Sequence, residues 1–454
     1  MYDMRPVRAG FVAFGEINTP QELIQGRANE ASKTLADQGV EIISTAPVSD
    51  DPAGSQADRA AQELSGKDMD LLIVCVIGWI PTWAIIRTLD RFRHLPVLVW
   101  GLSGRREGDR FVTAAAQAGT TALRPALDSM GYTFRYIVTR RGQDDPIAEI
   151  LSYARAARAA KLLRSARIGM IGYRDMRLYG TLYESQSLRS DIGPEIEHFD
   201  LLEIRNYMDE VSDDDVQTVC EDVRKKWTFV RDPQPETVPQ SARLYLALKR
   251  KLSEEQFDAF TYTDVDGIKK LLEFAPAGAM TMLHENLDIC TVPENDSLGS
   301  VTQLMTRFLT GQVAAYLEFY EFMDDGGLMG VPDYVPPEIV DGDVTIMPNA
   351  FGDFGEGLLN VSRLKTGEVT LARLACINDE YILHLMTGQA NAPIQWEEAG
   401  WAPPAPLLPS LDVIFDGDTD EFIQNVMSQH YIISYGDNSP AFVDLADILG
   451  LTII

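Results

Sequence analysis

Short apolar segments alternate with amphipathic helical segments from Arg8 onward, and this alternation constrains the fold more than any other feature. A first series contains the strand candidates GFVAFGE, VEIISTA, DLLIVCVIGW and PVLVWGL. A helix around residues 146–163 then connects to a second series, which opens with RIGMIGY. Continuous apolar strands separated by helices are typical of parallel sheets covered on both faces. We therefore expect two open α/β domains, over residues 1–165 and 166–312.

The character of the sequence changes after about Phe322. Helical periodicity nearly vanishes, and Gly326, Gly327 and Gly330, followed by several prolines, predict a loop. Short strand candidates separated by turns follow, which favours an antiparallel arrangement. The expected fold class is α/β, with two parallel-sheet α/β domains followed by a mostly antiparallel, barrel-like β domain over residues 313–454.

Composition and charge exclude several partners. The formal net charge is −29, and such a field repels nucleic acid and anionic membranes. No apolar run approaches the roughly 18 residues that cross a bilayer, and the first residues lack a signal-peptide pattern. We therefore expect a cytoplasmic protein. The four cysteines are widely spaced without a CxxC pair, so neither a zinc ribbon nor a disulfide framework is predicted.

The loops after the first strands carry no nucleotide-binding motif. They contain neither GxGxxG nor a P-loop lysine, so no nucleotide cofactor is expected. Trp79 and Trp83 lie near one strand end, where stacking on a sugar is an option. Core packing is the favoured interpretation.

The stretch from Cys290 to Asp325 predicts a turn, a helix that ends near Gly311, and a strand. Glu294 precedes the helix and Glu318 lies within the strand. If the two carboxylates converge, their hard oxygen atoms suit Mn²⁺ or Mg²⁺, which polarises a carbonyl and a hydroxyl of a bound substrate. The spacing permits this convergence without requiring it.

The same stretch resembles the core of the L-fucose isomerase and L-arabinose isomerase superfamily. The resemblance rests on a Glu-x-Asp turn, a helix of the form GxxTxxxxxxxTG, a second carboxylate on the next strand, and a C-terminal His. The matching residues are Glu294, Asp296, Gly299, Thr302, Thr310, Gly311, Glu318 and, in QHYIISYGD, His430. Glu318 stands where the fucose-type enzymes more often have Asp.

The resemblance implies an aldose–ketose isomerase that acts on a free sugar through an enediol. Glu294 and Glu318 inherit the roles of catalytic acid and base, and Glu294, Glu318 and His430 those of metal ligands. The implied cofactor is Mn²⁺, or another divalent cation such as Mg²⁺ or Co²⁺. A homo-oligomer, trimer or hexamer, is also implied, in which the first domain helps to cover the active site of a neighbour.

Some residues depart from the family pattern or have another interpretation. Met347 stands where a further His is expected, and a thioether is a poor ligand for a hard cation. Asn349 and Asp353 are candidates for polar contacts there. Asp296 is interpreted as a helix cap or a support for the ligands rather than as a ligand, although its position in a turn does not fix which way it points.

Three other histidines are not expected to take part in the site, and two other functions stay open. His198, His284 and His384 are interpreted as structural or surface residues, because no ligand pair lies near them in the sequence. A sugar-binding or regulatory homologue without catalysis stays open as an alternative. So does a metal-dependent epimerase or aldolase that uses the same site.

Overall fold

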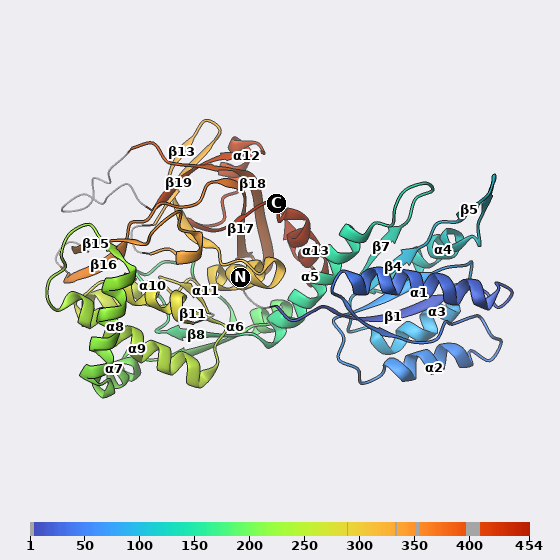
Figure 1. Cartoon of the computed structure of the whole chain (residues 1–454), viewed down its shortest axis with the longest axis horizontal. Helices are drawn as coiled ribbons and strands as arrows, with labels where there is room; N and C mark the ends of the chain where they lie inside the picture. The colour runs from blue at the N-terminus through green and yellow to red at the C-terminus, as the bar shows by residue number, and fades with distance from the viewer. Residues whose placement is uncertain (1–3, 288, 332–333, 351–353, 396–408) are drawn as a thin grey trace. The chain divides into compact units, whose positions relative to one another are not determined.

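The computed structural model describes residues 4–287, 289–331, 334–350, 354–395 and 409–454 (Figure 1). These residues divide into two compact units. The smaller unit comprises Met4–Lys161 and Val443–Leu449, and the larger one Leu162–Phe442 and Gly450–Ile454. Among the helices in these ranges, none is both long and apolar enough to span a bilayer.

The smaller unit is a parallel sheet with helices on both faces. The sheet has the order β2-β1-β3-β4-β7, and all neighbouring strands are parallel. Its strands are β1 (Arg8–Phe14), β2 (Glu41–Ser44), β3 (Leu71–Val76), β4 (Val97–Gly101) and β7 (Phe134–Val138). The helices are α1 (Gln21–Asp37), α2 (Ser55–Leu64), α3 (Thr82–Leu89), α4 (Ala116–Ser129) and α5 (Ile147–Ser165), and β5 (Arg105–Glu107) and β6 (Arg110–Val112) form a hairpin.

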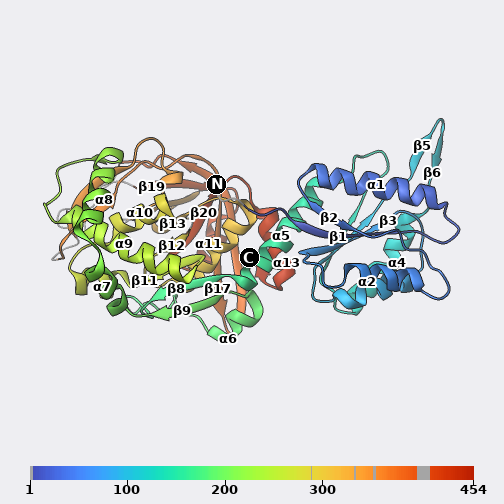
Figure 2. The ribbon, with the colours of Figure 1, turned by 60° about the horizontal axis from the view of Figure 1, so that its bottom comes forward.

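Apolar side chains on the two faces of this sheet form separate clusters. Residues of α1 and α5 pack on one face, and those of α2, α3 and α4 on the other (Figure 2). Ile448, from the part of α13 (Ser439–Leu449) that belongs to this unit, packs on the first of these faces. Trp79 and Trp83 are both 41% exposed, so the expectation that they pack in the core is wrong. Trp79 lies in the loop after β3, and Trp83 lies in the first turn of α3.

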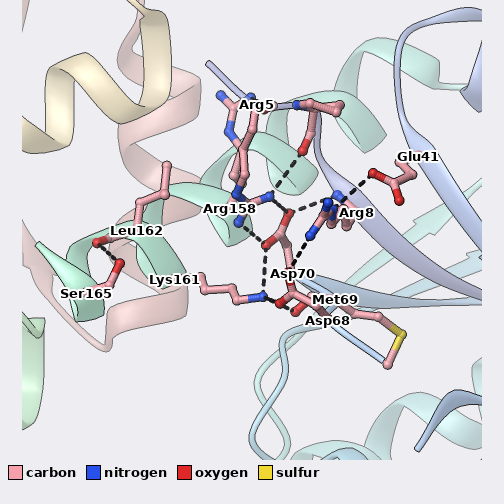
Figure 3. A network of polar contacts seen from close by, with 11 residues as sticks. Arg5, Arg8, Glu41, Asp68, Met69, Asp70, Arg158, Lys161, Leu162 and Ser165 are labelled. Carbon is pink, nitrogen blue, oxygen red and sulfur yellow. Dashed lines mark hydrogen bonds and ion pairs between the residues drawn. The ribbon is translucent and has the colours of Figure 1, made fainter. Parts of the chain in front are cut away.

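An ion-pair network joins the start of β1 to helix α5 in this unit (Figure 3). Asp70 is buried and accepts two hydrogen bonds from the Arg5 guanidinium, at 2.8 and 2.6 Å. The backbone N–H of Arg8 donates to the same carboxylate at 2.9 Å, and Lys161 Nζ lies 3.6 Å from it. Because several donors converge on one buried anion, we expect the network to fix the N-terminal strand to α5.

Asp70→Asn should therefore destabilise the smaller unit by about 3 kcal/mol, since it leaves the cations of a buried pair without their anion. The free energy of urea unfolding measures this effect. Asp58→Asn is the matched control, because Asp58 makes an equally short two-bond pair with Arg87 on the surface. We expect no measurable change for that exposed pair. Equal effects of the two variants would contradict this structural role for the network.

The larger unit begins with a second parallel sheet, of order β12-β11-β8-β9. Its strands are β8 (Arg167–Ile171), β9 (Glu195–Phe199), β11 (Ala259–Tyr262) and β12 (Cys290–Val292). The α-helices of this part are α6 (Ser185–Ser187), α7 (Leu201–Glu210), α8 (Asp213–Lys226), α9 (Thr237–Glu255), α10 (Ala277–Asn286) and α11 (Ser297–Thr310). A small sheet consists of β10 (Thr228–Phe229), β15 (Thr345–Ala350) and β16 (Glu356–Asn360).

Six antiparallel strands of the described chain close into a barrel. The order is β17-β20-β13-β14-β19-β18, and β18 pairs back with β17. These strands are β13 (Ala315–Met323), β14 (Gly326–Gly330), β17 (Gly367–Ile377), β18 (Glu380–Asn391), β19 (Ser410–Phe415) and β20 (His430–Tyr435). The short helix α12 (Thr419–Gln424) precedes β20, and β21 (Thr452–Ile453) pairs with β18. The expected fold class, parallel α/β sheets followed by an antiparallel barrel, is confirmed.

Two local expectations are wrong. The glycine-rich segment predicted as a loop is the buried strand β14. Glycine is needed there because a Cβ atom at Gly326 would lie 1.8 Å from the Val413 carbonyl oxygen of the neighbouring strand. The apolar residues of EIEHFDLLEI also predict a strand over residues 195–204. The strand β9 ends instead at Phe199, because Asp200 and Glu203 form a capping box that begins α7. The division of the larger unit at residue 312 into two domains stays a prediction.

Candidate functional site

A turn at the carboxyl end of β12 carries Glu294. Glu294 and Asn295 have φ angles of 62° and 53°, in the left-handed region that side chains other than glycine rarely adopt. Asn295 is fully buried, and its side chain donates to the Ile171 carbonyl at 2.7 Å. Its backbone N–H donates to the Tyr262 carbonyl at 3.0 Å. These contacts with β8 and β11 hold the strained turn, and strain of this kind is concentrated at functional sites.

Asp296 begins helix α11, and the predicted cap is confirmed. Its carboxylate accepts a hydrogen bond from the Gly299 backbone N–H at 2.9 Å. A Cβ atom at Gly299 would lie 2.6 Å from this carboxylate, which explains the glycine of the motif. The helix ends at Thr310, and Gly311 follows with a φ of 70°, as the sequence predicts.

Helix α11 contacts both the parallel sheet and the barrel (Figure 2). Its Thr302 hydroxyl accepts a hydrogen bond from the Leu374 backbone N–H of β17 at 3.0 Å. The Gln303 side chain donates to the Ala314 carbonyl, just before β13, at 3.1 Å. The helix therefore connects the turn that bears Glu294 to the barrel strands.

Glu318 and His430 lie opposite each other on the antiparallel strands β13 and β20. Residues paired in this way project to the same face of a sheet. His430 Nε2 lies 3.7 Å from Glu318 Oε2, and His430 Nδ1 lies 3.9 Å from Glu294 Oε2. The structure thus brings together the three side chains that the family resemblance names, from segments far apart in the sequence.

The imidazole of His430 is buried and neutral. Burial lowers its pKa to about 3; the charge of Asp296 raises it, and that of Arg373 lowers it. The ring stacks on Tyr316, with 4.2 Å between ring centroids and 15° between planes. A neutral ring presents a lone pair, which is the form that binds a metal ion.

The donor types fit a divalent metal ion, whereas their present placement is not that of a formed metal site. Two carboxylates and a neutral imidazole suit Mn²⁺, Mg²⁺ or Co²⁺. Over the residues that the structure describes, no group of three or more His, Cys, Asp or Glu side chains is arranged to hold a metal. Glu294 approaches Nδ1 of His430 and Glu318 approaches Nε2. A metal ion bound to one of these nitrogens would be reached by both carboxylates only if one of them rotated.

Two candidates from the third predicted domain, Met347 and Asn349, lie on strand β15. Met347 is a β15 residue, and its side chain packs against an apolar cluster, as does Tyr334. Asn349 is buried on the same strand. Asp353 lies outside the described residues. The correspondence of Met347 to a family His stays a prediction.

Sequence reasoning missed two residues that surround the site, Tyr316 and Arg373. Tyr316 precedes Glu318 by two positions on β13, so the period of a strand places both on one face. Arg373 is the one charged side chain within the apolar segment VTLARLACI, and its side chain is 1% exposed. A buried cation requires a partner. That signal in the sequence points to an acidic residue nearby, without identifying it as Asp296.

The three remaining buried or strand histidines have hydrogen-bond partners outside the site. His198 contacts the Gly172 carbonyl at 2.7 Å. His284 Nε2 lies 2.6 Å from the Tyr334 hydroxyl, and His384 Nδ1 lies 2.7 Å from the Tyr431 hydroxyl. These contacts agree with the expected structural roles.

Comparisons with known proteins agree with the resemblance. Residues 184–282 match the family described as the L-arabinose isomerase central domain. The chain is 22% identical over 401 residues to sulfoquinovose isomerase of Priestia megaterium (strain ATCC 12872 / QMB1551), covering 86% of each protein. It is 26% identical over 166 residues to L-fucose isomerase of Haemophilus influenzae (strain PittEE), covering 36% of this chain and 28% of that enzyme.

A second L-fucose isomerase, from Vibrio vulnificus (strain YJ016), is 22% identical over 328 residues, covering 64% of this chain and 55% of the enzyme. Among solved structures, a periplasmic sugar binding protein of Legionella pneumophila covers 67% of this chain at 14% identity, with 96% of its own length covered. Its TM-score of 0.18 is too low to bear on the fold. These family and enzyme matches, at low identity, support the resemblance to the fucose and arabinose isomerase-like superfamily.

Proposed function

We propose that this protein is a metal-dependent aldose–ketose isomerase that acts on a free sugar through an enediol intermediate. The matches to sulfoquinovose, L-fucose and L-arabinose isomerases support a sugar isomerase whose substrate is unspecified. The observation that carries the finer proposal is the approach of Glu294 and Glu318 to the two nitrogens of one buried imidazole, that of His430.

The reaction moves a proton between neighbouring carbons and requires a base, an acid and a stabiliser for the developing oxyanion. The Glu294 and Glu318 side chains are 16% and 25% exposed, so both are partly accessible to solvent. In the proposal, one carboxylate removes a proton from one carbon and keeps it, and the other, starting in its protonated form, gives its own proton to the adjacent carbon. The substrate hydroxyl proton moves to the former carbonyl oxygen, and exchange with solvent resets the two carboxyl groups. His430 stays neutral and orients the site. A bound divalent cation would polarise the substrate carbonyl and hydroxyl.

The test is a panel of aldoses and ketoses, including phosphorylated, sulfonated and branched sugars, assayed with Mn²⁺ before and after chelation. We expect interconversion of at least one aldose–ketose pair, its loss with the chelator, and its recovery on adding Mn²⁺ back. Binding of sugars without turnover would favour the alternative of a sugar-binding or regulatory homologue. Cleavage or inversion at another carbon would favour an aldolase or epimerase.

The proposal includes a cytoplasmic homo-oligomer, trimer or hexamer, with the active site near a subunit interface. The family resemblance supports this part. Light scattering of the purified protein measures the molar mass, and a mass of one chain, 50.4 kDa, would contradict it.

A further inference from the structure

The proposed site is built from two halves that belong to different sheets of the larger unit. Glu294 follows β12 of the parallel sheet, whereas Glu318 and His430 lie on barrel strands β13 and β20. The carboxylates reach the imidazole at 3.7 and 3.9 Å, without a direct hydrogen bond at these distances. The spacing of the halves must therefore be set by other contacts.

Asp296 joins the two halves directly. Arg373, on barrel strand β17, donates to both Asp296 oxygens, at 2.5 and 2.9 Å. The hydroxyl of Tyr316, on β13, donates to Asp296 Oδ2 at 2.8 Å. The Asp296 and Arg373 side chains are each 1% exposed. A carboxylate two residues from Glu294 thus receives three hydrogen bonds from the barrel.

The same contacts continue to His430. The Tyr316 ring that bonds Asp296 is stacked on the His430 ring. Arg373, Asp296, Tyr316 and His430 therefore form a continuous series of contacts, which starts and ends in the barrel and passes through the Glu294 turn. A shift of Asp296 would move the Glu294 turn and the support of His430 together.

Stability alone is a weak reason for a fully buried ion pair. The desolvation penalty of such a pair offsets most of its attraction, and apolar replacements are often as stable. What the pair supplies is direction, because a guanidinium and a carboxylate fit in one planar, two-bond geometry. Gly299 also fits this arrangement, since any side chain there would meet Asp296 and Arg373.

We infer that Arg373, Asp296 and Tyr316 act as a clamp that sets the spacing between Glu294 on one side and Glu318 and His430 on the other. All three are positioning residues. They act on the proposed metal ion and substrate only through Glu294 and His430. The catalytic consequence rests on the proposed function, whereas the effect of the clamp on His430 does not.

Arg373→Lys tests the clamp with the charge retained. Lysine cannot make the two-bond fork, so Asp296 should shift. We expect Mn²⁺ affinity to fall about tenfold or more, as for other residues that orient metal ligands. The kcat should fall by a similar factor, with KM changed less than about threefold, because the substrate contacts stay. Calorimetric titration with Mn²⁺ and steady-state kinetics give these values.

A readout that needs neither metal nor turnover is the ring ¹⁵N spectrum of His430 in the metal-free protein. The chain has five histidines, and the His430 signal is assigned by its absence from His430→Gln. We expect Arg373→Lys to shift this signal, because the Tyr316 ring follows Asp296. Tyr316→Phe keeps the stacking and removes one bond to Asp296, so it should shift the signal less and weaken Mn²⁺ binding by about threefold.

Arg5→Lys is the matched control, since Arg5 makes the same two-bond pair with a buried aspartate, Asp70, in the smaller unit. It should leave the His430 signal, Mn²⁺ affinity and kcat unchanged. If Arg373→Lys does not fold, Tyr316→Phe decides the question with the same readouts. An unchanged His430 signal and unchanged Mn²⁺ affinity in the folded variants would overturn the clamp.

Failure of the proposed function gives a different result. In that case the wild type itself neither binds Mn²⁺ specifically nor converts any sugar. The His430 signal would still shift in Arg373→Lys and stay unchanged in Arg5→Lys if the clamp is correct.

Discussion

Glu294→Gln and Glu318→Gln should each lower kcat by about 10³-fold or more while the protein stays folded. Glutamine has nearly the shape of glutamate, but it neither accepts a proton at neutral pH nor carries the negative charge that a hard cation prefers. Loss of a general acid or base alone costs about 10²- to 10⁴-fold. In this site each carboxylate is proposed to fill that role and to bind the metal ion, so the two losses combine.

The matched control is Glu321→Gln, because Glu321 lies on the same strand as Glu318 and is exposed to solvent. We expect wild-type kcat and KM for it. Circular dichroism and thermal unfolding of all three variants separate lost chemistry from lost structure. Retention of more than a tenth of wild-type kcat by either site variant would contradict the assignment of that carboxylate.

The segment between Cys290 and Asp325 is predictable from sequence because its signals are local. A capping aspartate, helical spacing of apolar residues, a glycine stop and a strand-forming run lie within one continuous stretch. The positions of Glu294 at a strand end and Glu318 on a strand follow from these signals. The left-handed conformation of Glu294 and Asn295 does not, because neither residue type requires it.

The pairing of Glu318 with His430 could not be derived from local patterns. Strands β13 and β20 are neighbours in the barrel, but the other barrel strands lie between them in the sequence. The register of strands so far apart in the chain depends on closure of the whole sheet. Resemblance to a family supplied His430 in advance. The partner of Arg373 illustrates the same limit. The sequence shows an isolated charge in an apolar strand, but it does not show which of the many acidic residues pairs with Arg373.

The glycine-rich strand β14 shows how a correct local rule can give a wrong structure. Glycine and proline are the usual residues of loops, and the segment after Phe322 contains both. Here Gly326 is required by the close approach of the Val413 backbone, so its role depends on a neighbouring strand far along the chain. Tertiary contact therefore overrides turn propensity at this position.

The larger unit should lose stability as the pH falls from 7 to 5, because it buries two neutral histidines away from the proposed site. Burial lowers the pKa of His284 to about 3 and that of His384 to about 4, from an ordinary value of 6.5. Between 6.5 and these values the unfolded chain binds protons that the folded chain does not. The stabilising contribution is complete above pH 6.5 and is lost as the pH falls toward the folded pKa values.

The hydrogen bonds explain why these imidazoles resist protonation. The Tyr334 hydroxyl donates its single proton to the Thr291 carbonyl at 2.8 Å, so His284 Nε2 must be the donor in their contact. His284 then carries its proton on Nε2, and a second proton would leave a buried cation. His384 lies beneath Phe422, with 4.5 Å between the ring centroids, and has similarly apolar surroundings.

At 1.36 kcal/mol per pH unit, the interval from 6.5 to 5 gives about 2 kcal/mol for each histidine, or about 4 kcal/mol for both. Urea unfolding at pH 7.0 and 5.0 measures this difference. Pulsed hydrogen exchange, read out in peptides from α10 and β18, reports the unfolding of the larger unit specifically. His384→Gln should reduce the difference by about 2 kcal/mol, since glutamine does not titrate in this range. Only the difference between the two pH values matters, so any constant cost of the substitution cancels.

The other groups with shifted pKa values do not alter the comparison between variants. Burial lowers the pKa of His430 to about 3 as well, so in the metal-free protein His430 adds a loss of the same sign. Burial raises the pKa of Asp258 and Glu285, and a raised carboxyl pKa contributes stability that is lost as the pH rises, which is the opposite sign. Comparing each variant with the wild type at both pH values cancels their effect. His94→Gln is the control, because His94 is exposed on the smaller unit and should leave the pH dependence unchanged. The contradicting result is a His384→Gln protein with the same pH dependence as the wild type. It would show that the folded protein protonates this imidazole at its ordinary pKa. The burial of His384 would then be less complete than the packing of Phe422 and Tyr431 implies.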